Sequence, residues 1–208
     1  MDPLDKAILG SLYLSSLDPN IAALDRLRSH THLTLEVYNE KIEEFVALGL
    51  VEKDDNSKLT ILGRDAFKVV LVGGVFDLIH PGHIHTLKAA KAQGDVLIVV
   101  IARISTAAMI RKDRRIYHDE KLRAELVSSL RLVDLAVLGQ EGTLYETVEN
   151  IKPDVIALGY DQAHSEKEIA ENCQKRNLKV RIVRLNTPVP TTKSSEIKNH
   201  LGESFYRI

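Results

Sequence analysis

The spacing of apolar residues changes near residue 67 of this 208-residue chain. Before that position, leucine and isoleucine recur every three or four residues, which is the period of an amphipathic helix. After it, short runs of valine, isoleucine and leucine alternate with helical stretches, as in parallel strands covered on both faces. We therefore predict a small helical domain over residues 1–66 and, over residues 67–208, an α/β domain with a doubly wound parallel sheet.

The first domain contains a helical pattern followed by a hairpin pattern. The predicted elements are helices over residues 4–14, 21–27 and 35–48 and strands over residues 50–53 and 58–63. Thr34 is placed to cap the third helix, and Gly49 is a natural residue to follow its end. The polar residues 54–57 would form the turn between the two strands.

Three helices followed by a hairpin resemble a winged helix-turn-helix domain, as does the passage LGLVEKDDNSKLTILGRD. The resemblance implies DNA binding through the third helix. However, residues 1–67 carry 12 acidic against 7 basic residues. The third helix itself carries Glu36, Glu40, Glu43 and Glu44 against Lys41. Because lysine and arginine contacts to phosphate supply most non-specific DNA affinity, we favour a packing or dimerisation module over a DNA-binding regulator that senses nucleotides.

The second domain alternates strands with helices. The predicted strands cover residues 69–76, 96–102, 133–138, 154–158 and 180–185, and the predicted helices cover residues 82–93, 120–131, 144–151 and 166–175. In such sheets, ligands bind outside the carboxyl ends of the strands, near the point where the strand order reverses. The residues that follow each strand are therefore the first place to look for a site.

The first of these positions carries the sequence GGVFDLIHPGHIH, from Gly73 to His85. Glycines at the end of a strand let the backbone approach a ligand closely, and Pro81 and Gly82 allow a tight entry into a helix. The free N–H groups of a helix N-terminus bind phosphate readily. Two histidines three residues apart, His80 and His83, would face that phosphate and donate hydrogen bonds to it.

This segment resembles the HxGH signature of the nucleotidylyltransferase superfamily, in the form GxFDxxHxGH typical of its cytidylyltransferase-like branch. Three later passages support the resemblance in the same order: RIYHDEKLRAELVSSLRLVD, IKPDVIALGYDQ and TTKSSEI. The resemblance spans about residues 68–201. Its spacing is most similar to archaeal FAD synthases, and next to glycerol-3-phosphate cytidylyltransferases.

The resemblance implies an enzyme in which a phosphate of the acceptor attacks the α-phosphorus of a nucleoside triphosphate and pyrophosphate leaves. The donor would be ATP or CTP. FMN is our preferred acceptor, and glycerol 3-phosphate or a related polar head group is the alternative. Mg²⁺ would bridge the triphosphate with few protein ligands, because it keeps water and prefers substrate oxygens. Catalysis would consist of positioning two anions and neutralising the charge that develops.

The resemblance also assigns residues to this chemistry. The catalytic residues would be His80, His83 and Lys112, the last in the basic run at 111–115. The nucleotide-binding residues would be Gly74, Val75, Phe76, Asp77, Gly82, Arg123, Gly159, Asp161, Thr192, Ser194 and Ser195. Asp77 has two interpretations, a metal-side residue or one that fixes its loop by hydrogen bonds. Val75 stands where related enzymes commonly have threonine, which removes a hydroxyl from this loop.

Composition and charge complete these expectations. The chain has 28 basic and 29 acidic residues, but residues 68–208 alone carry 21 against 17, so the excess positive charge lies on the domain expected to hold triphosphate. The single cysteine, Cys173, permits no intramolecular disulfide and fits a reducing compartment, so we expect a cytoplasmic protein. Apolar stretches shorter than ~20 residues predict no membrane segment. With a dimerisation module in the first domain, we expect a homodimer.

Overall fold

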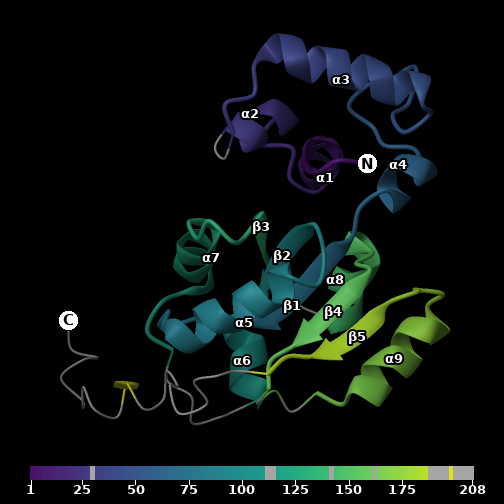
Figure 1. The fold of residues 1–208 in the computed structure, drawn as a ribbon. Helices are drawn as coiled ribbons and strands as arrows, with labels where there is room; N and C mark the ends of the chain where they lie inside the picture. The colour runs from purple at the N-terminus through teal and green to yellow at the C-terminus, as the bar shows by residue number, and fades with distance from the viewer. Residues whose placement is uncertain are drawn as a thin grey trace. The chain divides into compact units, whose positions relative to one another are not determined.

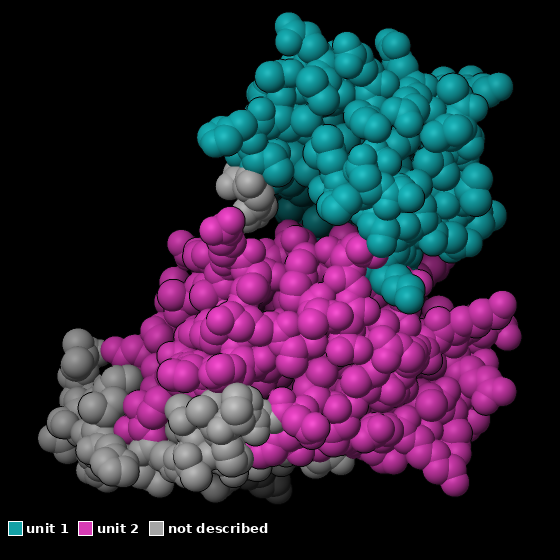
Figure 2. All heavy atoms as spheres, in the orientation of Figure 1, with its two compact units in different colours: residues 1–68 teal, residues 69–208 magenta. Residues whose placement is uncertain are grey.

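The computed structural model of the chain describes residues 1–28, 31–110, 116–140, 143–160, 162, 164–186, 197 and 198 (Figure 1). The chain forms two compact units, Met1–Lys68 and Val69–Ile208, which Figure 2 colours separately. Among the described residues, every helix is too short or too polar to cross a membrane.

The first unit is helical. Its helices are α1 (Pro3–Leu17), α2 (Ala23–Arg28), α3 (Leu35–Ala47) and α4 (Ile61–Asp65). The predicted cap of α3 is confirmed, because the Thr34 hydroxyl accepts a hydrogen bond from the amide of Val37 at 3.3 Å. Gly49 follows this helix with a φ of +70°, a conformation that glycine adopts without strain.

The second strand of the predicted hairpin is wrong, because its last residues form α4. The Thr60 hydroxyl caps this helix by accepting from the amide of Gly63 at 3.1 Å. Among the described residues, the hairpin pairing is reduced to one isolated antiparallel bridge between Val51 and Leu59. The resemblance to a winged helix therefore stays a prediction for this unit.

A small apolar core holds the first unit together. Ile8 and Leu9 of α1 and Phe45 of α3 are almost fully buried. The ring centroids of Tyr13 and Phe67 lie 5.8 Å apart, and the guanidinium of Arg64 lies 5.0 Å from the first and 5.2 Å from the second. Burial of these apolar side chains stabilises the unit.

The second unit is built on a five-stranded parallel sheet in the order β3-β2-β1-β4-β5. The strands are β1 (Val69–Gly74), β2 (Val96–Ile101), β3 (Leu135–Leu138), β4 (Val155–Leu158) and β5 (Arg181–Arg184). All residues of β2 and β4 are buried, so both faces of the central strands are covered. The predicted doubly wound α/β fold is confirmed.

Helices connect these strands (Figure 1). They are α5 (Pro81–Lys91), α6 (Ile104–Ile110), α7 (Glu120–Ser128), α8 (Leu144–Ile151) and α9 (Glu166–Lys175). Leu87 of α5 and Val127 of α7 pack with alternate strand residues such as Val72 and Val99 in one buried cluster, so these two helices cover the same face. The short helix α6 was not among the predicted elements.

The strand order reverses between β1 and β4. Chain connections leave β1 toward β2 on one side, whereas β4 lies on its other side. The register pairs Val72 with Ala157, so the two strands end at about the same level. This carboxyl edge is the switch point at which an open α/β sheet binds its ligand.

Candidate active site

The loop that leaves β1 is fixed by the packing of Phe76. This residue adopts a φ of +48°, a backbone conformation that residues other than glycine rarely take. Its buried ring lies over Gly74, where an added Cβ would come within 2.6 Å of a ring atom. A side chain at position 74 would therefore displace the Phe76 ring, and the strained Phe76 backbone sets the direction of the following residues.

The structure brings the two predicted histidines together at the start of α5. His80 is the N-cap residue of this helix and Pro81 occupies its first turn. The ring centroids of His80 and His83 are 3.9 Å apart, and the ring of Phe76 lies 5.1 Å from that of His83. Gly82, also a predicted site residue, is buried in the first turn. Two imidazoles beside the positive end of a helix form a suitable environment for an anionic group.

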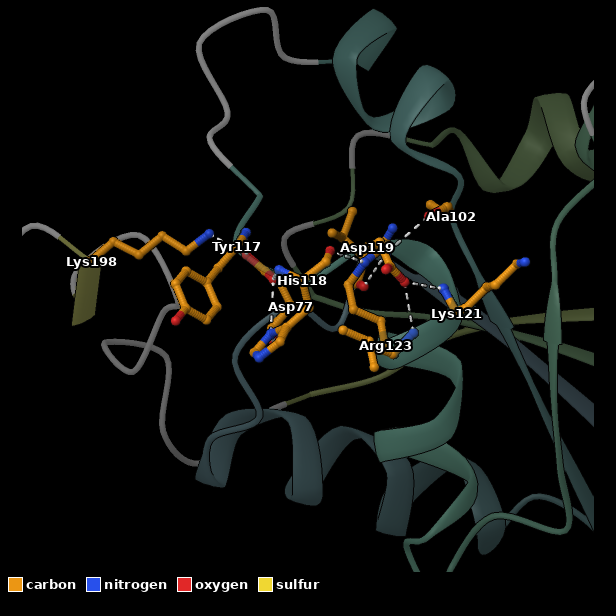
Figure 3. Close-up of polar contacts among 10 residues, drawn as sticks. Asp77, Ala102, Tyr117, His118, Asp119, Lys121, Arg123 and Lys198 are labelled. Atoms are coloured by element: carbon orange, nitrogen blue, oxygen red, sulfur yellow. Dashed lines mark hydrogen bonds and ion pairs between the residues drawn. The ribbon is translucent and has the colours of Figure 1, made fainter. Parts of the chain in front are cut away.

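The carboxylate of Asp77 is bonded to two other segments of the chain. Its buried carboxylate accepts hydrogen bonds from the amides of Tyr117 and His118, both at 2.8 Å, and forms an ion pair with Lys198 (Figure 3). Burial raises the pKa of Asp77, but the hydrogen bonds from the two amides and the charge of Lys198 outweigh it, so the pKa lies below its ordinary value. Of the two interpretations, the structure favours loop fixation.

Arg123 lies beneath the same loop. Its guanidinium is fully buried and donates from Nη1 to the carbonyls of Val75 at 2.6 Å and Ala102 at 2.9 Å, and from Nε to the carbonyl of His118 at 3.1 Å. These bonds join the ends of β1 and β2 to the segment before α7 (Figure 3). In this geometry Arg123 donates to backbone carbonyls around the loop, and the phosphate contact expected for Arg123 stays a prediction.

The loop after β4 is tied to β1 by a residue that sequence reasoning missed. The side chain of Gln162 accepts from the amide of Gly159 at 3.1 Å and donates to the carbonyl of Gly73 at 2.6 Å. Arg184, at the end of β5, holds the same loop through several of its carbonyls. The GYDQ turn at residues 159–162 could have pointed to Gln162 as a site residue. Arg184 stands alone at the end of an apolar run, so the sequence does not indicate which groups it contacts.

The remaining predicted site residues lie outside the described part of the chain. They are Lys112, Asp161, Thr192, Ser194 and Ser195. Within the described part, no three His, Cys, Asp or Glu side chains are grouped as a metal site, and the carboxylate of Asp77 is already occupied.

Comparison with known proteins places this architecture in a family. Residues 71–200 match the family model described as cytidylyltransferase-like. An FAD synthase from Aciduliprofundum boonei is 48% identical over 116 residues, which cover 56% of this chain and 76% of that protein. An FAD synthase from Picrophilus torridus is 40% identical over 139 residues, which cover 66% of this chain and 99% of that protein.

A solved structure agrees with these matches. The crystal structure of the lipopolysaccharide core biosynthesis protein from Thermoplasma volcanium is 44% identical and has a TM-score of 0.56, over 59% of this chain and 98% of that one. The match to the family model takes in more than half of the chain and includes the loops at both strand ends of the switch point. The chain therefore belongs to the cytidylyltransferase-like family of nucleotidyltransferases.

Proposed function

We propose that the unit Val69–Ile208 is an FAD synthase, an enzyme that transfers AMP from ATP to the phosphate of FMN and releases pyrophosphate. The observation that carries this proposal is the similarity to curated FAD synthases at 40% to 48% identity, over 76% to 99% of the length of three such proteins. The paired histidines at the start of α5 supply the donors that the reaction requires.

The reaction needs no protein nucleophile. An oxygen of the FMN phosphate forms a bond to the α-phosphorus of ATP, and the bond from that phosphorus to the bridging oxygen of the β-phosphate breaks. Both reactants are anions, so the protein must hold them in line and neutralise the charge that develops. His80 and His83 would donate hydrogen bonds to the phosphates, and the N-terminus of α5 would add its partial positive charge.

Three residues beneath the site would hold these donors in place. Hydrogen bonds of Asp77 and Arg123 join the loop after β1 to residues 117 and 118. A hydrogen bond of Gln162 joins the loop after β4 to Gly73. Further phosphate and nucleotide contacts are proposed for the predicted residues outside the described part: Lys112, Asp161, Thr192, Ser194 and Ser195. The divalent cation would be Mg²⁺ that enters with ATP and neutralises charge on the triphosphate when bound.

The test measures donor and acceptor together. The full chain is incubated with Mg²⁺ and either ATP or CTP, with FMN or glycerol 3-phosphate as acceptor, while pyrophosphate release and the nucleotide product are followed. We expect turnover with ATP and FMN and the appearance of FAD. Turnover with CTP and glycerol 3-phosphate, and none with ATP and FMN, would contradict the proposal.

A further inference from the structure

Arg184, the last residue of β5, makes several contacts with one loop. Its Nη1 atom donates to the carbonyls of Gly159 and Gln162, both at 3.0 Å, and its Nη2 atom donates to the carbonyl of His164 at 2.7 Å. Its Nε atom donates to the carboxylate of Glu166, the first residue of α9, at 2.8 Å. One guanidinium thus spans the connection from β4 to α9.

Gln162 lies within the same connection and bonds both the connection itself and β1. Its side-chain oxygen accepts from the backbone amide of Gly159, and its backbone amide donates to the carbonyl of Gly159 at 3.2 Å. The side-chain nitrogen reaches across to the carbonyl of Gly73 in the neighbouring strand, 89 positions earlier in the chain. Arg184 therefore holds the loop along its length, and the side chain of Gln162 joins it to β1.

The loop held by these contacts lies at the carboxyl edge of the sheet, where the ligand is expected. It follows β4 at the switch point, directly beside the end of β1. The loop on the β1 side leads to the histidine pair and the positive end of α5, which suit the phosphates. A nucleotide that fills the crevice between the two strands then presents its nucleoside portion to the loop after β4.

We propose that Arg184 and Gln162 are positioning residues that hold the loop after β4 where it binds the nucleoside portion of the donor nucleotide. Arg184 suits this task because a guanidinium offers five donors in a rigid planar arrangement, whereas a lysine ammonium is a compact group on a flexible stem. The inference rests on the proposed function for the identity of that nucleotide, ATP.

The test compares Arg184→Lys and Gln162→Leu with the unaltered full chain. Lysine keeps the positive charge but cannot reach three carbonyls and a carboxylate together, and leucine removes both side-chain bonds of Gln162. Contacts to the nucleoside are equal in the ground state and the transition state, so their loss raises KM and leaves kcat unchanged. We expect KM and Kd for ATP to rise about tenfold in each variant and kcat to stay within about threefold.

The matched control is Arg181→Lys at the other end of the same strand. Arg181 is exposed and donates to the side chain of Gln93 at 3.1 Å, away from the carboxyl edge, so this variant should behave as the unaltered chain. Thermal unfolding verifies that each variant folds. If Arg184→Lys fails to fold, Gln162→Leu decides.

Two measurements separate this proposal from the proposed function. The Kd for ATP is obtained by titration calorimetry without an acceptor, and KM and kcat are obtained from FAD formation. ATP binding that yields no FAD would contradict the proposed function, while the Kd values of the variants would still test the loop. A Kd for ATP within twofold of the unaltered chain in both variants, or a fall in kcat with unchanged KM, would overturn the positioning role.

Discussion

Side chains around the candidate site divide into two sets. His80 and His83 lie at the start of α5, at the edge where a phosphate is expected, with their rings beside each other and the ring of Phe76 beside that of His83. Asp77 and Arg123 lie beneath that edge, almost without exposed surface, and bond backbone groups of the loops. Substitutions in the first set should therefore impair chemistry, whereas substitutions in the second should impair the fold as well.

His83→Ala tests the first set. Loss of one donor to the charge that develops in the transition state lowers kcat about 100-fold or more, and the thermal unfolding midpoint stays near that of the unaltered chain. Initial rates of FAD formation and a thermal melt measure both effects. His85→Ala, on the same helix but outside the pair, is the control; full turnover in the His83 variant would remove the histidine from the mechanism.

Asp77→Asn tests the second set through pH. Because the pKa of Asp77 is lowered in the folded protein, its carboxylate adds stability above its unfolded pKa of about 3.8, and this stability is lost as the pH falls through the lower folded pKa. We expect the variant to be less stable at neutral pH and the difference in unfolding free energy to shrink below about pH 4. Denaturant unfolding at several pH values measures it. Glu125→Gln, at an exposed position of α7, is the control substitution. A constant difference for Asp77→Asn would contradict the assignment.

At the scale of elements, local signals decided how well the sequence could be interpreted. The helices over residues 144–151 and 166–175 were predicted with the bounds that the structure shows, because Thr143 and Ser165 cap them and apolar residues recur at helical spacing. The first residues of the short α4 were predicted as part of a strand. The helix begins at the Thr60 cap, and the Thr60 amide donates to the carbonyl of Leu50, a contact that the pattern of residues 58–63 does not indicate. The histidine pair was predictable since its members are neighbours, whereas the partners of Arg123 lie as far as 48 positions away.

Gly74→Ala tests the junction of β1 with its loop. The added methyl group would lie 2.6 Å from the ring of Phe76, which must move, and we expect a loss of about 1–3 kcal/mol in unfolding free energy together with reduced turnover. Gly73→Ala is a closely matched control, because a Cβ there meets nothing within 4 Å. Denaturant unfolding of both variants checks the prediction, which equal stabilities would contradict.

At the scale of the whole molecule, the two units differ in charge and in their relatives. Residues 1–67 carry 12 acidic against 7 basic residues, which opposes DNA binding by this unit, whereas residues 68–208 carry 17 against 21. The family model matches residues 71–200, within the second unit. One curated relative is matched over 99% of its length by 139 residues, which cover only 66% of this chain.

Deletion of residues 1–67 tests whether the first unit serves dimerisation and the second unit alone carries out the reaction. If the first unit serves dimerisation, the truncated chain keeps kcat within about twofold and its mass in solution falls from that of a dimer to that of a monomer. Light scattering after size-exclusion chromatography gives the mass, and FAD formation gives kcat. A truncated chain that remains a dimer would exclude the dimerisation role, and a large loss of kcat would show that the first unit takes part in the reaction.

The carboxylate of Asp77 also has a consequence for how the protein folds. It joins residues 117 and 198, which follow it by 40 and 121 positions, so two long stretches of chain must be closed before it is satisfied. Closure of long loops costs chain entropy before any contact stabilises the product, and it is slow. During synthesis, the strands of the sheet are all made before Lys198 emerges. The sheet can therefore assemble on the nascent chain, but the carboxylate of Asp77 gains its last partner only after Lys198 has been made.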